Sequence, residues 1–212
     1  MESYYTIKEA GSYEIEINKS RFICQMSRTE TEDQANGFIE SVKKDHYKAT
    51  HNCSAYTIGM KDDIQRAHDD GEPSGTAGVP MLEILKKREL KNVTAVVTRY
   101  FGGKKLGAGG LIRAYSRAVN DAVKAIGVVK RQSLQALDVT VPYPVSGSLE
   151  NALRESDYLL NDTEYTDQVT FKCFVEPEQV DQFKSEVTEW TNDQASFHLG
   201  AKAYIDIDQE IN

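Results

Sequence analysis

The sequence of 212 residues contains no long hydrophobic run. Its apolar stretches, such as residues 93–97, are only a handful of residues long, whereas a membrane-spanning helix needs about 20. The first residues lack the basic start and the apolar stretch of a secretory signal peptide. We therefore expect a cytoplasmic protein without a membrane partner.

Cysteine is also scarce. The three cysteines, Cys24, Cys53 and Cys173, are odd in number, widely spaced and form no CxxC pair, which excludes a disulfide framework and fits a reducing compartment. The sequence has no HExxH pair for zinc and no calcium-binding loop of the usual spacing. It also has no GxxxxGK(S/T) loop and no GxGxxG motif. We therefore expect no metal and no cofactor.

Basic residues are rare in the last part of the chain. Residues 133–212 hold 4 Lys and Arg against 16 Asp and Glu, whereas residues 1–132 hold 21 against 17. Within residues 84–131 there are 12 basic residues and only two acidic ones, Glu89 and Asp121. This asymmetry predicts one segment basic enough to bind a polyanion and one that would repel it. A solvated basic face without a partner is the alternative.

The hydrophobic periodicity predicts an α+β protein with two domains, residues 1–132 and 133–212, joined by a linker around 129–133. In the first domain, Thr31 is expected to cap a helix. The other elements expected there are strands 13–17, 21–26, 53–60, 64–68 and 93–98 and helices 80–89 and 109–126. In the second domain, the predicted order of elements is βαββαβ, as in a ferredoxin-like fold.

A glycine-rich loop connects a buried strand to the long helix. Five glycines fall within nine residues there, and glycine permits both a positive φ and the close approach of a ligand to the backbone. The free N–H groups and the dipole at a helix start attract anions. A tight turn with a purely structural role is the alternative. The residues expected to contact an anion or RNA are Arg99, Gly102, Gly103, Lys104, Lys105, Gly107, Gly109, Gly110, Arg113, Arg117 and Lys124.

A second loop, residues 69–76, is rich in acidic side chains. Carboxylates beside a histidine can act as acid and base, but the same residues can also form a rigid turn whose side chains cap their own backbone. The candidates for this second loop of the site are His51, Asp69, Glu72 and Thr76. No residue is assigned a catalytic role, and Cys53 is expected to be buried and inert.

Four motifs occur in a fixed order along the first domain. They are residues 19–23 (KSRFI), 49–53 (ATHNC), 69–80 (DDGEPSGTAGVP) and the segment from Arg99 to Tyr115. Together they resemble the IMPACT/YigZ family, in its bacterial form. The resemblance implies a first domain similar to domain 2 of ribosomal protein S5. It also implies a ferredoxin-like second domain similar to domain V of elongation factor G.

The resemblance also carries a functional expectation, because eukaryotic relatives regulate translation under amino-acid starvation. We expect a non-enzymatic, translation-associated stress regulator that binds RNA or the ribosome through the basic, glycine-rich surface. One alternative is an enzyme acting on a small phosphorylated or acidic substrate in a cleft between loops 69–76 and 99–110. Another is a protein-interaction adaptor. A deep cleft in which His51, Glu72 and Arg99 converge would favour the enzyme, and an open basic face would favour RNA.

Overall fold

The computed structural model describes residues 3–209 and contains two five-stranded sheets. These residues divide into two compact units, residues 3–131 with 206–209, and Gln132–Ile205. Strands β7 (Val128–Val141) and β10 (Ser196–Gln209) contribute residues to both units. The linker expected around 129–133 is therefore part of strand β7.

The expected domain limits differ from these units in two respects. Gln132 was expected in the first domain but belongs to the second unit. The sequence placed residues 206–209 in the second domain, whereas the structure groups them with the first unit. The outermost positions of the expected domains, 1–2 and 210–212, lie outside the described residues. That residues 1–132 and 133–212 form two independently folding domains stays a prediction.

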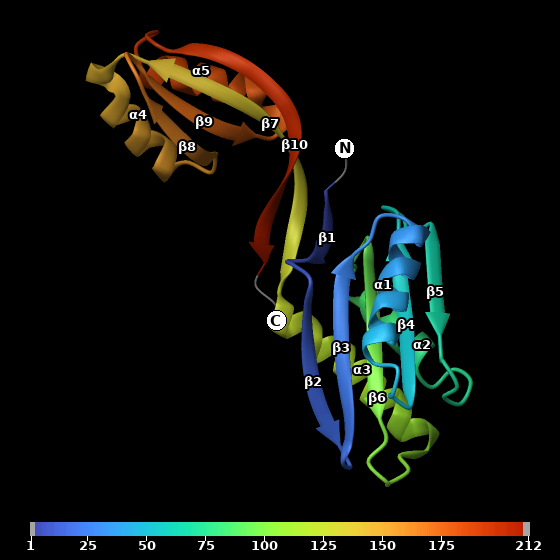
Figure 1. Ribbon diagram of the computed structural model, residues 1–212. Helices are drawn as coiled ribbons and strands as arrows, with labels where there is room; N and C mark the ends of the chain where they lie inside the picture. Colours follow the sequence, from blue (N-terminus) through green and yellow to red (C-terminus); the bar gives the residue numbers. More distant parts are fainter. Residues whose placement is uncertain (1–2, 210–212) are drawn as a thin grey trace. The chain divides into compact units, whose positions relative to one another are not determined.

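The first unit is built on an antiparallel sheet with helices on both faces (Figure 1). Helix α1 packs on one face, and α2 and α3 pack on the other. The strands, in sheet order, are β2 (Gly11–Ile17), β3 (Ser20–Arg28), β6 (Val93–Tyr100), β4 (His51–Ile58) and β5 (Ile64–His68). The helices are α1 (Glu32–Asp45), α2 (Gly78–Lys87) and α3 (Gly107–Ile126), and β1 (Tyr4–Ile7) pairs with β7.

The continuous apolar run of β6 follows from this arrangement. Successive side chains of a strand point to opposite faces, so Val93, Ala95 and Val97 join the core under α2 and α3, while Val96 joins the core under α1. Both faces of the strand are therefore buried, as its β-branched sequence predicted.

The predicted first helix begins where its capping residue indicated. The Thr31 side chain accepts a hydrogen bond from the Gln34 amide (3.2 Å). The Gln34 side chain accepts one in return from the amide of Glu30 (2.8 Å), one residue before the expected capping-box position. Several predicted bounds were less accurate: α2 begins at Gly78 rather than Pro80, β4 at His51 rather than Cys53 and α3 at Gly107 rather than Gly109. The short strand β1 was not predicted.

The second unit has the predicted βαββαβ order, and the two-domain α+β class is confirmed. After β7 follow α4 (Tyr143–Glu155), β8 (Leu159–Tyr165), β9 (Val169–Val175), the 3-10 turn η1 (Pro177–Gln179), α5 (Val180–Trp190) and β10. Strand β7 pairs with β9 and with β10, and β8 pairs with β9. Leu137, Leu149 and Phe183 are among the buried side chains between this sheet and its helices.

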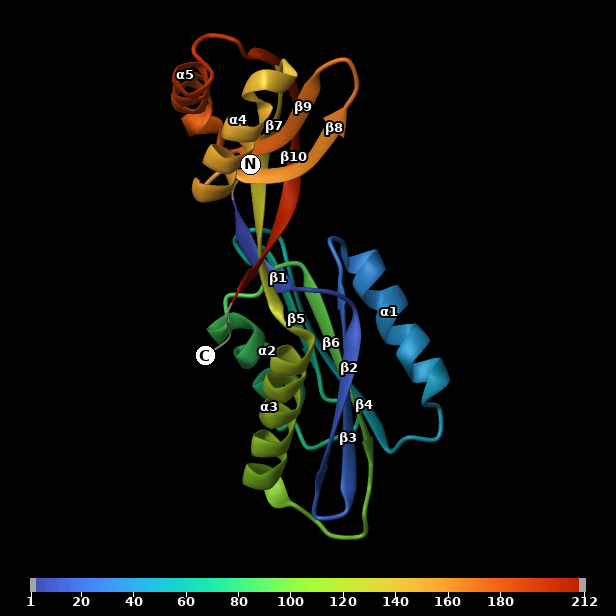
Figure 2. The same cartoon turned by 90° about the vertical axis from the view of Figure 1, so that its left-hand side faces the viewer.

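The fold brings the glycine-rich loop to the end of the first unit where β2 turns into β3 (Figure 2). The Gly102 amide donates a hydrogen bond to the Ser20 hydroxyl (3.1 Å). A Cβ atom at Gly102 would lie 2.0 Å from the carbonyl carbon of Lys19, so the close approach of these two segments requires glycine. Among residues 3–209, no helix is long and apolar enough to cross a membrane.

Candidate functional site

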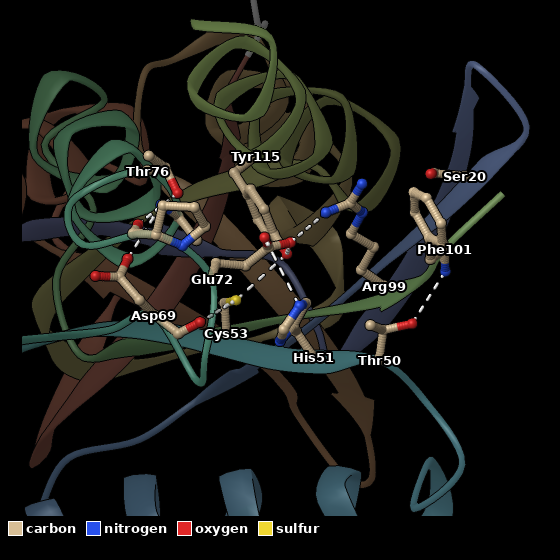
Figure 3. Close-up of polar contacts among 12 residues, drawn as sticks. Ser20, Thr50, His51, Cys53, Asp69, Glu72, Thr76, Arg99, Phe101 and Tyr115 are labelled. Atoms are coloured by element: carbon tan, nitrogen blue, oxygen red, sulfur yellow. Dashed lines mark hydrogen bonds and ion pairs between the residues drawn. The ribbon is translucent and has the colours of Figure 1, made fainter. Parts of the chain in front are cut away.

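Glu72, from the acidic loop, lies at the centre of a polar cluster (Figure 3). Its side chain is 3% exposed. One carboxylate oxygen, Oε1, accepts hydrogen bonds from Arg99 Nη1 (2.6 Å) and from the Tyr115 hydroxyl (2.8 Å). The three side chains come from the acidic loop, β6 and α3, so the cluster joins three segments that are far apart in the sequence.

His51 faces the second oxygen of the same carboxylate. Its Nε2 atom lies 3.7 Å from Glu72 Oε2, and its Nδ1 atom lies 2.8 Å from the carbonyl oxygen of Asp70. Because a carbonyl only accepts hydrogen bonds, Nδ1 must carry the hydrogen. In the neutral ring Nε2 is then the acceptor atom, and it is the ring atom that faces Glu72.

Arg99 is held between two aromatic rings and is only 7% exposed. Its guanidinium carbon lies 5.4 Å from the centre of the Phe22 ring and 5.6 Å from that of Phe101, which is within cation–π range. Its Nε atom is buried and donates no hydrogen bond to any described residue. Arg99 therefore combines an ion pair with a buried donor that has no partner among the described residues.

Cys53 is buried next to this cluster, and its thiol is expected to be unreactive. Its Sγ atom lies 2.9 Å from the carbonyl oxygen of Asp69 and 3.3 Å from the Tyr115 hydroxyl oxygen, and either oxygen can accept the thiol hydrogen. Burial raises the pKa of the Cys53 thiol to about 12 and also raises the pKa of Tyr115, with further contributions from Cys53 and Glu72. Both groups therefore stay protonated at neutral pH, which agrees with the expectation that Cys53 is inert.

The Asp69 side chain, in the acidic loop, caps the start of α2. Its carboxylate accepts hydrogen bonds from the amides of Gly75 (2.8 Å), Ala77 (3.1 Å) and Gly78 (2.9 Å). Burial alone would raise the pKa of Asp69, but these backbone donors hold it below its usual value. Thr76 is buried, and its hydroxyl donates to the Pro73 carbonyl (2.6 Å). Asp69 and Thr76 thus stabilise the conformation of the loop. Of the three predicted residues in this loop, only Glu72 lies beside His51.

A cavity of about 370 Å³ opens beside the cluster. His51, Glu72 and Arg99 line its polar side. The remaining wall consists of Thr50, Pro73, Phe101, Lys105, Leu106, Gly107, Ala108 and Leu111. The volume is within the range of small-molecule sites, and the walls combine apolar side chains with a few polar groups.

The predicted basic residues are distributed around this cavity and along α3. Lys104 and Lys105 are exposed in the loop before α3, and Lys105 also lines the cavity. Arg113 and Arg117 line a second hollow of about 370 Å³ on the other side of Leu106. Lys124 is exposed two residues before the end of α3. Arg99 differs from the others because it lies buried against Glu72 instead of on the surface.

The glycines of the loop have different roles. Gly103 (φ +86°) and Gly107 (φ +68°) adopt left-handed backbone conformations, and a Cβ atom at either position would meet no described atom within 4 Å. Gly109 and Gly110 lie in the first turn of α3, which has no capping side chain from Leu106. The backbone at the start of α3 is therefore open to a ligand, whereas that of Gly102 is covered by Lys19.

Several residues of the site carried no clear signal in the sequence. Tyr115 packs in the core, and its hydroxyl also donates a hydrogen bond to Glu72. Thr50 accepts a hydrogen bond from the Phe101 amide (3.1 Å), and Pro73 lines the cavity. Among residues 3–209, no three His, Cys, Asp or Glu side chains gather closely enough to hold a metal ion.

Comparison with known proteins identifies the family to which the chain belongs. The family model of the Impact N-terminal domain matches residues 18–123, and that of a domain of unknown function, DUF1949, matches residues 139–194. The chain is 53% identical over 206 residues to the IMPACT family member YvyE of Bacillus subtilis (strain 168), covering 97% of this chain and 95% of that protein. The chain belongs to the IMPACT family.

Further similarities agree with this family membership. The chain is 35% identical over 178 residues to the IMPACT family member YigZ of Escherichia coli (strain K12), covering 83% of this chain and 87% of YigZ. A crystal structure of a hypothetical protein is similar with a TM-score of 0.60 and 31% identity, covering 93% of this chain and 97% of the other. The residues that line the cavity beside Arg99 all lie within the Impact N-terminal domain.

Proposed function

We propose that this IMPACT family member is a translation-associated regulator that binds RNA or the ribosome through the basic surface around the start of α3. The observation that carries the proposal is the set of exposed cations Lys104, Lys105 and Arg113. Within the part of the chain that the structure describes, none of the three forms an ion pair with an acidic side chain. Such cations are available to the phosphates of a polyanion.

The backbone beside these cations supports the same proposal. The first N–H groups of a helix have no partner within the helix, and they favour an anion. At α3 these groups lie next to Lys105 and to the open glycines Gly103 and Gly107. The relation to eukaryotic proteins that regulate translation supplies the cellular context. Residues 133–212, with 4 basic against 16 acidic side chains, would repel RNA.

The test is co-sedimentation of the protein with Bacillus subtilis ribosomes and with total RNA at about 50 and 200 mM salt, because phosphate contacts weaken steeply with salt. We expect binding at the lower salt that is lost at the higher salt or after nuclease treatment. Changing Lys104 and Lys105 together to Glu should remove two phosphate contacts. The slope of log affinity against log salt should then fall by about 1.4–1.8.

Lys86→Glu with Lys87→Glu is the matched control for charge. These two lysines are adjacent and exposed in the last turn of α2. Arg88 follows them and contacts Asn120 in the second half of α3, so the pair lies away from the start of α3. Equal losses in both double variants would contradict a local site. Absence of binding at either salt would refute RNA binding, and binding that survives nuclease would indicate a protein partner.

The convergence of His51, Glu72 and Arg99 on one cavity favours a second candidate, catalysis on a small phosphorylated or acidic substrate. His51 Nε2 and Glu72 Oε2 lie 3.7 Å apart beside the cavity, and an imidazole beside a carboxylate is suited to acid–base catalysis. Release of p-nitrophenol from p-nitrophenyl phosphate, abolished by His51→Gln, would favour this candidate over RNA binding.

A further inference from the structure

The cavity beside Arg99 has features that phosphate binding alone does not require. A surface that only holds phosphates needs exposed cations and N–H groups. This cavity adds apolar walls from Phe101, Leu106 and Leu111 and a polar floor of buried side chains. The ligand that it fits therefore has a flat or compact apolar body as well as a polar edge.

The floor of the cavity offers an acceptor that the protein does not use. Glu72 uses Oε1 for its two hydrogen bonds, while Oε2 has only His51 Nε2 at 3.7 Å. A carboxylate oxygen without a hydrogen bond favours a ligand that presents an N–H donor, as the polar edge of a nucleobase does.

The side wall and the rim complete the description of the ligand. Phe101 is 48% exposed, and its ring forms part of the wall beside the Arg99 guanidinium. An aromatic ring backed by a cation is a stacking platform for a nucleobase. At the rim, Lys105 and the uncapped start of α3 at Gly107 are suited to a phosphate.

We propose that the cavity beside Arg99 binds the base of an unpaired nucleotide, while the nucleotide's phosphate lies at Lys105 and the start of α3. This inference rests on the proposed RNA-binding function and names the kind of RNA that the site selects. The base stacks on Phe101, and its polar edge meets Glu72 Oε2. A base that is paired in a duplex has this edge occupied, so the site distinguishes single-stranded from double-stranded RNA.

The test compares three probes by fluorescence anisotropy at one salt concentration. They are a short labelled single-stranded RNA of mixed sequence, the same strand annealed to its complement, and adenosine or uridine 5′-monophosphate as an unlabelled competitor. We expect the single strand to bind at least tenfold more tightly than the duplex, the fold-change of one stacked base. Inorganic phosphate is the control competitor, and competition by the free monophosphates at far lower concentrations would support recognition of the base in this cavity.

Two variants assign any preference to the cavity. Phe101→Leu keeps an apolar side chain but removes the stacking ring, and it should abolish most of the tenfold preference. Tyr13→Leu is its control, because Tyr13 is 43% exposed in the same unit and does not line the cavity. Ala108 is exposed on α3 and lines the cavity, so Ala108→Leu should narrow the cavity and weaken single-strand binding. Its control is Ala125→Leu, because Ala125 is exposed on the same helix and does not line the cavity.

The outcomes separate this inference from the function on which it rests. If single strand and duplex bind equally, and Lys104→Glu with Lys105→Glu weakens both, RNA binding stands and the base-binding cavity is refuted. If the single-strand preference survives both Phe101→Leu and Ala108→Leu, the base binds elsewhere and the inference is also wrong. If no RNA binds at any salt, the proposed function fails as well.

Discussion

The acidic loop makes a strong prediction about stability, because Asp69 satisfies three backbone donors at the start of α2. Replacing Asp69 by Ala removes the acceptor of the amides of Gly75, Ala77 and Gly78. Gly75 is half-buried and can bond to water instead, whereas Ala77 and Gly78 are buried. Hydrogen bonds to a charged group contribute about 1.5–3 kcal/mol each. Two lost bonds therefore predict a decrease of about 3–6 kcal/mol in the free energy of unfolding.

Asp69→Asn is the milder comparison. Its amide oxygen can still accept from Ala77 and Gly78, but its NH₂ group cannot accept from Gly75. We expect a loss of about 1–2 kcal/mol, since neutral hydrogen bonds are weaker than those to a carboxylate. Because small domains are stable by only about 5–15 kcal/mol, this variant keeps the test informative even if Asp69→Ala does not fold.

The assay is urea unfolding followed by two signals. Trp190 is the only tryptophan of the chain and packs against the core of the second unit, so its fluorescence reports that unit. Far-UV circular dichroism reports both units. The midpoint of the circular dichroism change should fall while that of fluorescence stays close to the wild-type value. A change below about 0.5 kcal/mol in Asp69→Ala, which is typical of a surface substitution, would refute the capping role.

The pH dependence of stability tests separately whether the Asp69 carboxylate is ionised in the folded protein. The pKa of Asp69 is lowered below its usual value of 3.8 in the folded protein. Its stabilisation is therefore complete above the unfolded pKa and is lost as the pH falls through the folded pKa. The stability difference between wild type and Asp69→Asn should be full at pH 7 and should shrink below about pH 4. A difference that stays constant down to pH 2 would contradict an ionised cap.

Two further predictions test the surroundings of the site. Gly102→Ala should destabilise the protein by more than about 3 kcal/mol, because its Cβ atom would lie 2.0 Å from the Lys19 backbone and the backbone would have to move; urea unfolding checks this, and a stable variant would disprove the close approach. Native Cys53 should react with iodoacetamide far more slowly than the unfolded chain, since burial raises the pKa of its thiol to about 12. Peptide mass spectrometry after a short labelling pulse measures this, and rapid native labelling would contradict it.

The elements of the fold were largely predictable because their signals are local. The apolar spacing of α3 and the continuous β-branched run of β6 both depend on neighbours within a few residues. The βαββαβ order of the second unit followed from such patterns one element at a time. The short strand β1 was missed because its pairing partner, β7, lies more than 120 residues away along the chain, and four residues carry too little periodicity to identify a strand.

The site was predictable only in part, because its chemistry depends on contacts between distant segments. The sequence identified the loops that carry His51, Glu72 and Arg99 but not how they combine. Glu72 and Arg99 are 27 residues apart and pair in the interior. No local pattern reports such a pair, and Arg99 was therefore grouped with the exposed cations. Tyr115 follows the apolar period of its helix, so nothing in the sequence marked its hydroxyl as a partner of Glu72.

The two glycine-containing loops show why similar sequences can serve different purposes. Each loop leads into a helix, and each helix start presents N–H groups that favour an anion. At α2 the protein supplies that anion itself, through the carboxylate of Asp69. At α3 Leu106 provides no such cap, and the cavity with Lys105 adjoins the helix start. An external phosphate therefore has a physical reason to bind at α3 and none at α2. Mutation of Asp69 should accordingly lower stability, whereas mutation of Lys104 and Lys105 should lower RNA binding and leave stability nearly unchanged.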